Sequence, residues 1–302
     1  MNCITGTLLL MPIREYPKGL YANVSGTLST LKAFIWSTYE YPRRTLHDFL
    51  HSQLMWAVTV MIICGYWNSV FQIYADSIAG FWKYKHQPFV LMDIAFDVLP
   101  HIESEHISDY YLKWCIYATA IRFMFTPLRL VILRRYCFMQ AVIFLLRGFS
   151  VFATLLPCPM TGCVSTAVGN PFVEALYIML GYHRTCADLL FSGHTANLTM
   201  CAFIWEYYCE KVPFFNPVYE RVASWIAAMV GFVVFLSNHF RYSCDVFVGF
   251  VMAALVFNMY HSYVLTISTR NNFFNSFLRW FEEDADEIPK LVRLASRKTL
   301  TH

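Results

Sequence analysis

Four polar residues stand out as a set that could transfer a phosphoryl group. His194 lies six residues after Asp188 in one apolar stretch, and His239 lies six residues before Asp245 at the start of another. An imidazole can attack phosphorus or donate a proton, and a carboxylate can orient it. Arg241 lies between the second pair, and a guanidinium can hold the charge of phosphate oxygens. Together these residue types favour phosphoryl-transfer chemistry.

The composition places these residues in a membrane protein. The 302 residues are 57% hydrophobic and 14% charged, and their mean hydropathy is +0.44. The net charge of +3 forms no basic stripe, which argues against a nucleic-acid partner. The ten cysteines form no CxxC pair and no zinc-type spacing with histidine, so we predict no metal site and no cofactor.

Six apolar stretches are long enough to cross the bilayer, whose hydrocarbon core takes about 20 helical residues. The predicted spans are 52–75, 114–133, 136–156, 189–205, 222–238 and 246–269, with a turn at Arg134 and Arg135. The sequence therefore predicts an all-α integral membrane protein with six transmembrane helices. Residues 49–266 would form the six-span domain, between an N-terminal segment, 1–48, and a charged tail, 267–302.

The distribution of basic residues orients these spans. Fifteen Lys and Arg residues fall on the side of the two ends and five on the other, so we expect both ends to be cytosolic. The candidate residues would then lie at the lumenal or exoplasmic ends of the spans. In the tail, the acidic cluster that starts at Glu282 is expected to be solvated. The alternative for the tail is a basic run, 290–298, held against anionic lipid.

Residues 186–195, CADLLFSGHT, closely resemble the CGDxxxSGHT motif of the sphingomyelin synthase and sphingolipid synthase family, a membrane branch of the type 2 phosphatidic acid phosphatase superfamily. Arg134, Arg135 and Arg147, followed by TLLP at 154–157, look like the RR…R…TxLP segment of that family. DVLP at 97–100 is a looser match to its first lumenal motif. The resemblance extends over roughly residues 45–266.

The resemblance implies a lipid phosphotransferase that works at the lumenal face of the Golgi or plasma membrane. It would pass the phospho-head-group of a glycerophospholipid to ceramide through a phosphohistidine and release diacylglycerol. The favoured donors are phosphatidylcholine and phosphatidylethanolamine, with phosphatidylinositol left open, and a homo-oligomer is compatible with the family. His194 would be the general acid, and Asp245 would orient the nucleophilic histidine. The expected substrate- and phosphate-binding residues are Asp188, Ser192, Arg241, Arg147 and Arg135.

The link before Asp245 departs from the family pattern, in which a histidine lies four residues before the aspartate. Here Arg241 holds that position, and His239 is the nearby histidine. A two-residue bulge could keep His239 as the nucleophile, or Arg241 could have replaced it and left a phosphate clamp that cannot attack. We favour His239, because a loop residue need not obey helical spacing.

Other readings of these residues stay open. A lipid phosphate phosphatase would use water as the acceptor, although its KxxxxxxRP motif is missing here. A pseudo-synthase would bind ceramide without turning it over, and a six-span carrier lacks the expected inverted repeat. Asp188 could simply cap a helix, and Arg147 could be a structural pair between helices. Cys158 and Cys163 could form a disulfide in an oxidising compartment.

Overall fold

The computed structural model describes residues 53–85, 91–102, 106–124, 126, 128–156, 158–159, 163, 165–166, 169–186, 189–209, 216–239, 241–266 and 273–282. All of them lie in one compact unit, Arg44–Ile288. The regular elements in these residues are helices and no strand is present among them, as predicted. The segment 1–48 and most of the tail 267–302 lie outside the described residues.

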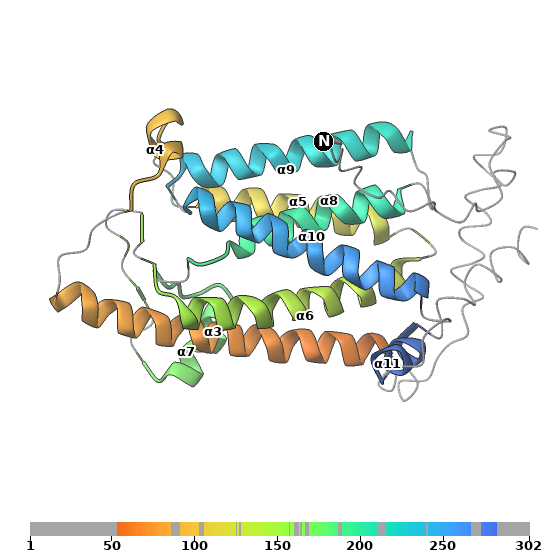
Figure 1. Ribbon diagram of the computed structural model, residues 1–302, viewed down its shortest axis with the longest axis horizontal. Coiled ribbons are helices and arrows are strands. Elements are labelled where there is room, and N and C mark those ends of the chain that lie inside the picture. The colour runs from red at the N-terminus through yellow and green to blue at the C-terminus, as the bar shows by residue number, and fades with distance from the viewer. Residues whose placement is uncertain are drawn as a thin grey trace, which may run out of the picture. The chain divides into compact units, whose positions relative to one another are not determined.

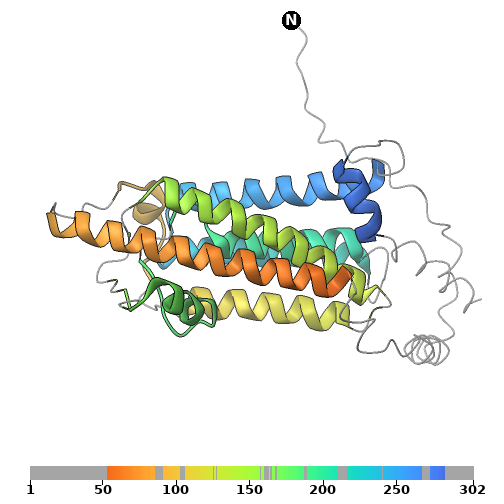
Figure 2. The ribbon, with the colours of Figure 1, turned by 90° about the horizontal axis from the view of Figure 1, so that it is seen from below.

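Six long helices run side by side in the described part of the chain (Figure 1, Figure 2). They are α3 (Gln53–Lys85), α5 (Ile107–Met124), α6 (Arg129–Ala153), α8 (Gly193–Tyr208), α9 (Pro217–Ser237) and α10 (Ser243–Thr266). Helix α8 is central, since it contacts α5, α6, α9 and α10. The short helices α4 (Ile94–Val98) and α7 (Pro171–Met179) lie at one end, and α11 (Phe273–Glu282) lies at the other (Figure 1).

Local sequence signals set where several of these helices begin. Asn216 accepts a hydrogen bond from the N–H of Val218 and is followed by Pro217, which starts α9. Asn170 and Pro171 do the same for α7. An asparagine cap satisfies a backbone donor that the first turn leaves open, and proline at the first position loses no helical hydrogen bond.

In the part of the chain that the structure describes, four helices are long and apolar enough to cross a membrane. They are α3 over Gln53–Ala79, α6, α9, and α10 over Ser243–Val264. Two further predicted spans correspond to α5 and α8, which have 18 and 16 residues. The count of six spans and the cytosolic placement of both ends therefore remain predictions.

The predicted turn at Arg134 and Arg135 is wrong. Both arginines are buried inside α6, and the chain leaves the helical conformation earlier, before Leu128 caps the start of that helix. Pro127 accounts for this position in the sequence, because proline cannot continue a helix and restricts the residue before it. The basic pair suggested a loop because buried arginines are rare without a partner.

The partner of both arginines is Glu282 in the tail. We expected the acidic cluster that starts at Glu282 to be solvated, and this prediction is wrong for Glu282 itself. Glu282 ends α11 and is buried, with its carboxylate 2.6 Å from Arg135 Nη2 and 3.3 Å from Arg134 Nη2. The hydroxyl of Tyr260 also donates to Glu282. Buried charges are tolerated when they are paired and hydrogen-bonded, so this cluster fastens α11 to α6 and α10.

The suggested Cys158–Cys163 disulfide is also wrong. Cys163 is bonded to Cys186, and Cys158 keeps its thiol. The N–H of Cys186 donates to Asp76 Oδ1 at 2.9 Å, which ties this part of the chain to α3. The disulfide and this hydrogen bond therefore both fix the position of Cys186, which lies shortly before α8.

Candidate active site

Helix α8 presents His194 in its first turn. Ser192 caps the helix, and its hydroxyl accepts a hydrogen bond from the N–H of Thr195 at 3.2 Å. Phe191 before it has a left-handed φ of 42°, a conformation that is rare for a bulky residue and that turns the chain sharply into the helix. Ser192 is thus the helix cap, and Asp188 lies outside the described residues.

Asp109, in the first turn of α5, is the partner of His194. Its Oδ1 lies 2.7 Å from His194 Nε2, although the two residues are 85 apart in sequence. The edge of the His194 ring packs on Phe235 at the end of α9. A carboxylate at this position can orient the imidazole and stabilise its protonated form. The pair has the geometry of an acid–base dyad.

Arg147 reaches the start of α8 from α6. The side chain is 5% exposed, its Nε donates to the carbonyl of Phe191 at 3.2 Å, and its Nη1 donates to Asn68 Oδ1 at 3.3 Å. A side chain at Gly193 would come within 3.1 Å of Arg147 Nε, so glycine is needed for this approach. Arg147 is thus held between α3 and the start of α8, close enough to His194 for its charge to act on that ring.

His239 lies in the turn that joins α9 to α10. Its φ of 48° is left-handed, and its ring lies between Phe96 and His101, with both centroids 4.3 Å away. Its Nε2 is buried and has no hydrogen-bond partner within the described part of the chain. Burial and the neighbouring His101 lower the pKa of His239, while Asp93 opposes this. The imidazole is therefore neutral near pH 7, as a nucleophile must be.

Asp93 binds the segment around α4 to the same turn. Its carboxylate accepts hydrogen bonds from the N–H and the hydroxyl of Ser243, at 2.6 and 2.7 Å, and from the N–H of Ala95. Burial alone would raise the pKa of Asp93, but these hydrogen bonds outweigh it and the pKa is lowered. The N–H of Leu91 donates to the Tyr242 hydroxyl at 3.2 Å. These bonds place a negative charge beside His239.

Asp245 joins the start of α10 to the start of α8. The residue is fully buried, its Oδ2 accepts from the N–H of Tyr242 at 3.2 Å, and its backbone carbonyl accepts from the N–H of Ser192 at 3.0 Å. Gly249 permits this contact, since a Cβ there would be 2.7 Å from the Ser192 carbonyl. The starts of α8 and α10 therefore lie side by side.

Arg241 is buried in the same turn, with 3% of its surface exposed, and its charge acts on the His194 ring together with that of Arg147. The guanidinium groups of Arg147 and Arg241 thus lie near the His194–Asp109 pair. The structure does not bring Arg135 to this cluster. Arg135 donates to the Tyr208 hydroxyl at the far end of α8, and fourteen residues separate Tyr208 from His194, or about 21 Å of helix.

Comparisons with known proteins show what the chain is similar to. The model of the family described as "PAP2 superfamily C-terminal" matches residues 185–262. Mouse (Mus musculus) "Sphingomyelin synthase-related protein 1" is 28% identical over 218 residues, which cover 68% of this chain and 44% of that protein. Human (Homo sapiens) "Phosphatidylcholine:ceramide cholinephosphotransferase 2" is 27% identical over 169 residues, which cover 50% of this chain and 45% of that protein. The chain is thus similar to proteins of the sphingomyelin synthase family. It spans about half the length of the curated relatives it matches.

The region that the family model matches contains His194, His239 and Asp245, whereas Asp93 and Asp109 lie before it. Neither aspartate is among the site residues predicted from the sequence. The available signal was the position of Asp109 just before a predicted span, where an acid favours a helix N-terminus. Among the described residues, no three His, Cys, Asp or Glu side chains are close enough to hold a metal ion.

Proposed function

We propose that this protein is a sphingolipid synthase that transfers a phospho-head-group from phosphatidylcholine or phosphatidylethanolamine to ceramide and releases diacylglycerol. Relatives named phosphatidylcholine:ceramide cholinephosphotransferase support the reaction class. The observation that carries the proposal is the 2.7 Å contact between His194 and Asp109, beside two buried arginines. It supplies a proton donor next to cations that suit a phosphate.

The proposed first step begins with attack by neutral His239 on phosphorus. The bond from phosphorus to the diacylglycerol oxygen breaks, and His194 gives that oxygen a proton. Asp109 stabilises His194 while it is protonated, and Arg147 and Arg241 hold the charge on the phosphate oxygens. The products of this step are diacylglycerol and a phosphohistidine.

In the second step the primary hydroxyl of ceramide attacks the phosphohistidine. His194, now neutral, accepts the hydroxyl proton, and the bond between His239 and phosphorus breaks. Attack and departure must be roughly in line at phosphorus in both steps. The enzyme returns to its starting protonation state, and neither step requires a cofactor.

We also propose the topology that this chemistry needs: six spans, both ends cytosolic, and the site at the lumenal or exoplasmic face of the Golgi or plasma membrane. The Cys163–Cys186 disulfide supports this orientation, because it lies just before α8, at the end of the bundle that holds His194. Disulfides persist on the lumenal and extracellular sides of membranes.

A second candidate is a pseudo-synthase that binds ceramide without transfer. One observation favours it: Arg241 holds the family's nucleophile position, is buried and acts on His194. Both candidates predict binding of ceramide and a phospholipid, but turnover distinguishes them.

The test uses purified full-length protein in mixed micelles with fluorescent ceramide. Each donor is supplied in turn, namely phosphatidylcholine, phosphatidylethanolamine or phosphatidylinositol, and the products are separated by chromatography. A fluorescent phosphosphingolipid with equimolar diacylglycerol supports the synthase. A parallel arm with phosphatidic acid that releases inorganic phosphate would indicate a phosphatase. Ceramide binding without a product from any donor would establish the pseudo-synthase.

A further inference from the structure

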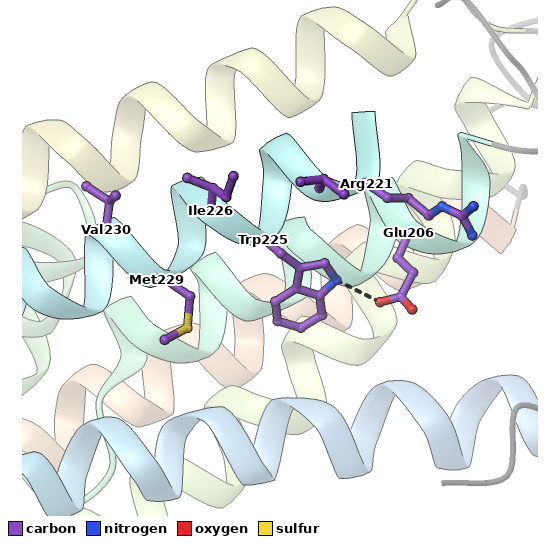
Figure 3. Close-up of a pocket in the computed structure, with 7 residues that line it drawn as sticks. Glu206, Arg221, Trp225, Ile226, Met229 and Val230 are labelled. Carbon is purple, nitrogen blue, oxygen red and sulfur yellow. Dashed lines mark hydrogen bonds between the residues drawn. The ribbon is translucent and has the colours of Figure 1, made fainter. Parts of the chain in front are cut away.

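A groove of about 500 Å³ runs along α9, far from His194 (Figure 3). One end is polar, formed by Glu206 of α8 and Arg221 of α9, with Trp225 beside them. The rest is apolar and is lined by Val222, Ile226, Met229 and Val230. Glu206 lies twelve residues after His194 on α8, or about 18 Å along the helix axis. The groove is therefore separate from the candidate active site.

The Glu206 carboxylate faces this groove with a neutral partner. Its Oε2 accepts a hydrogen bond from the indole Nε1 of Trp225 at 2.9 Å, which is its side-chain partner within the described part of the chain (Figure 3). Glu220 on the same helix as Trp225 differs, since it forms an ion pair with Arg122 at 2.8 Å. A carboxylate among apolar side chains is costly unless a cation compensates it. Glu206 is therefore suited to receive a cation from a ligand.

The positions of the charged side chains match the depth of a lipid head group. Glu206 lies two residues before the end of α8, and Arg221 lies four residues after the start of α9. Helix α9 is one of the helices long and apolar enough to cross a membrane. From Val222 to Val230 the apolar wall extends for about 12 Å along the axis, toward the middle of a bilayer.

We propose that this groove binds one zwitterionic glycerophospholipid of the leaflet opposite the candidate active site. Its ammonium group contacts Glu206 and the ring of Trp225, its phosphate lies at Arg221, and one acyl chain follows α9. A carboxylate with an indole face suits an ammonium group, and a guanidinium suits a phosphate. A volume of this size is typical of a site for a small ligand, roughly 300–1,000 Å³, so it accommodates the head group and the start of one chain. The proposal does not depend on the transfer reaction.

The test compares two lipids with identical chains, phosphatidylethanolamine and phosphatidylglycerol, of which the second has no ammonium. Full-length protein in detergent is titrated with each lipid, and bound lipids are counted by native mass spectrometry. We expect one site that prefers phosphatidylethanolamine by about fivefold, the equivalent of a partly exposed ion pair. Glu206→Gln keeps an oxygen for the Trp225 indole but removes the charge, so it should abolish this preference.

Two further variants locate the effect. Arg221→Gln should weaken binding of both lipids, because both carry the phosphate. Arg129→Gln makes the same change at the start of α6, outside the groove, and should leave both affinities unchanged. Matching thermal unfolding of wild type and Glu206→Gln, followed by tryptophan fluorescence, shows that the fold is kept.

Two outcomes would overturn the proposal. One is equal binding of the two lipids by wild type, and the other is an undiminished preference in Glu206→Gln. An independent measurement uses phosphatidylethanolamine with a photoactivatable diazirine in one acyl chain. We expect cross-links to peptides that contain residues 222–230, and cross-links confined to other helices would also reject the site.

Discussion

Arg135 and Arg147 lie on one helix, about 18 Å apart, and are 8% and 5% exposed. Their surroundings differ. Arg135 contacts the Glu282 carboxylate at 2.6 Å, so its charge is paired with an acidic group of the protein. Arg147 donates to a carbonyl and an amide, which are neutral acceptors, and its charge acts on His194. Similar burial of the same residue type thus serves two different purposes.

The difference lies in the groups that the buried arginines contact, and it leads us to predict different roles for the two ends of the bundle. At the α11 end, two guanidiniums share the carboxylate of Glu282, and the cluster joins three helices. At the α4 end, the buried Arg147 and Arg241 lie near the pair formed by His194 and Asp109. The first end should govern stability and the second should govern transfer.

The largest effect is expected from the residue that forms the covalent intermediate. His239→Ala should reduce transfer to background and should abolish the radiolabelled phosphohistidine that wild type accumulates from labelled donor lipid without ceramide. Arg241→His should raise the transfer rate little above that of wild type, because the turn is built around His239. The measurements are acid-labile, base-stable label on the protein, mapped by mass spectrometry, and product chromatography.

The opposite pattern would support the pseudo-synthase. In that case wild type would show no turnover and His239→Ala would be silent, whereas Arg241→His would restore a histidine four residues before Asp245 and could create activity. Guanidinium cannot act as the nucleophile, so these three proteins separate the two readings.

The general acid should have the next largest effect. His194→Ala should lower the transfer rate by about 10²–10⁴-fold, the usual contribution of a general acid. Stability should change little, because Ser192 and not His194 caps α8. His183→Ala is the matched control, since His183 pairs with Glu174 of α7 and should keep its transfer rate. Retention of more than about a tenth of the wild-type rate in His194→Ala would remove His194 from the mechanism.

At the other end the expected effect is on stability. Glu282→Ala leaves two buried guanidiniums without their carboxylate, which should cost about 3–5 kcal/mol of unfolding free energy. The transfer rate of the protein that remains folded should stay close to wild type. Thermal unfolding by tryptophan fluorescence and the micelle assay at low temperature measure the two quantities. An unchanged unfolding midpoint with a lost transfer rate would reverse the assignment of the two ends.

Apolar length is a local property, and the predicted stretches accordingly found the long helices α3, α6, α9 and α10. From the sequence, the turn is predicted at the basic pair Arg134 and Arg135, so the break near Pro127 is not predicted. The predicted span that contains His194 begins at residue 189, whereas α8 begins at Gly193, so His194 lies closer to the helix start than the sequence predicts.

The rest of the candidate site depends on contacts between distant segments. Asp109 meets His194 across 85 residues, and Asp93 meets Ser243 across 150. Nothing in the local pattern distinguishes these two aspartates from the other acids of their loop. The disulfide partner of Cys163 also depends on the three-dimensional path of the chain. Several cysteines lie near Cys163 in the sequence, and the fold brings Cys186 next to it.

The smallest expected effect concerns pH, and it tests whether His239 belongs to the catalytic end. Burial and His101 lower the pKa of His239, so the imidazole stays neutral at pH values where an ordinary histidine, with a pKa near 6.5, is half protonated. We expect the acid limb of kcat/KM, where His239 becomes protonated, to lie at lower pH than an ordinary histidine would give. His101→Gln removes a neighbour that lowers this pKa, so the acid limb should move to higher pH. Asp93 raises the His239 pKa, so Asp93→Asn should move the limb the other way. An acid limb that neither change moves would mean that the titrating group is not His239.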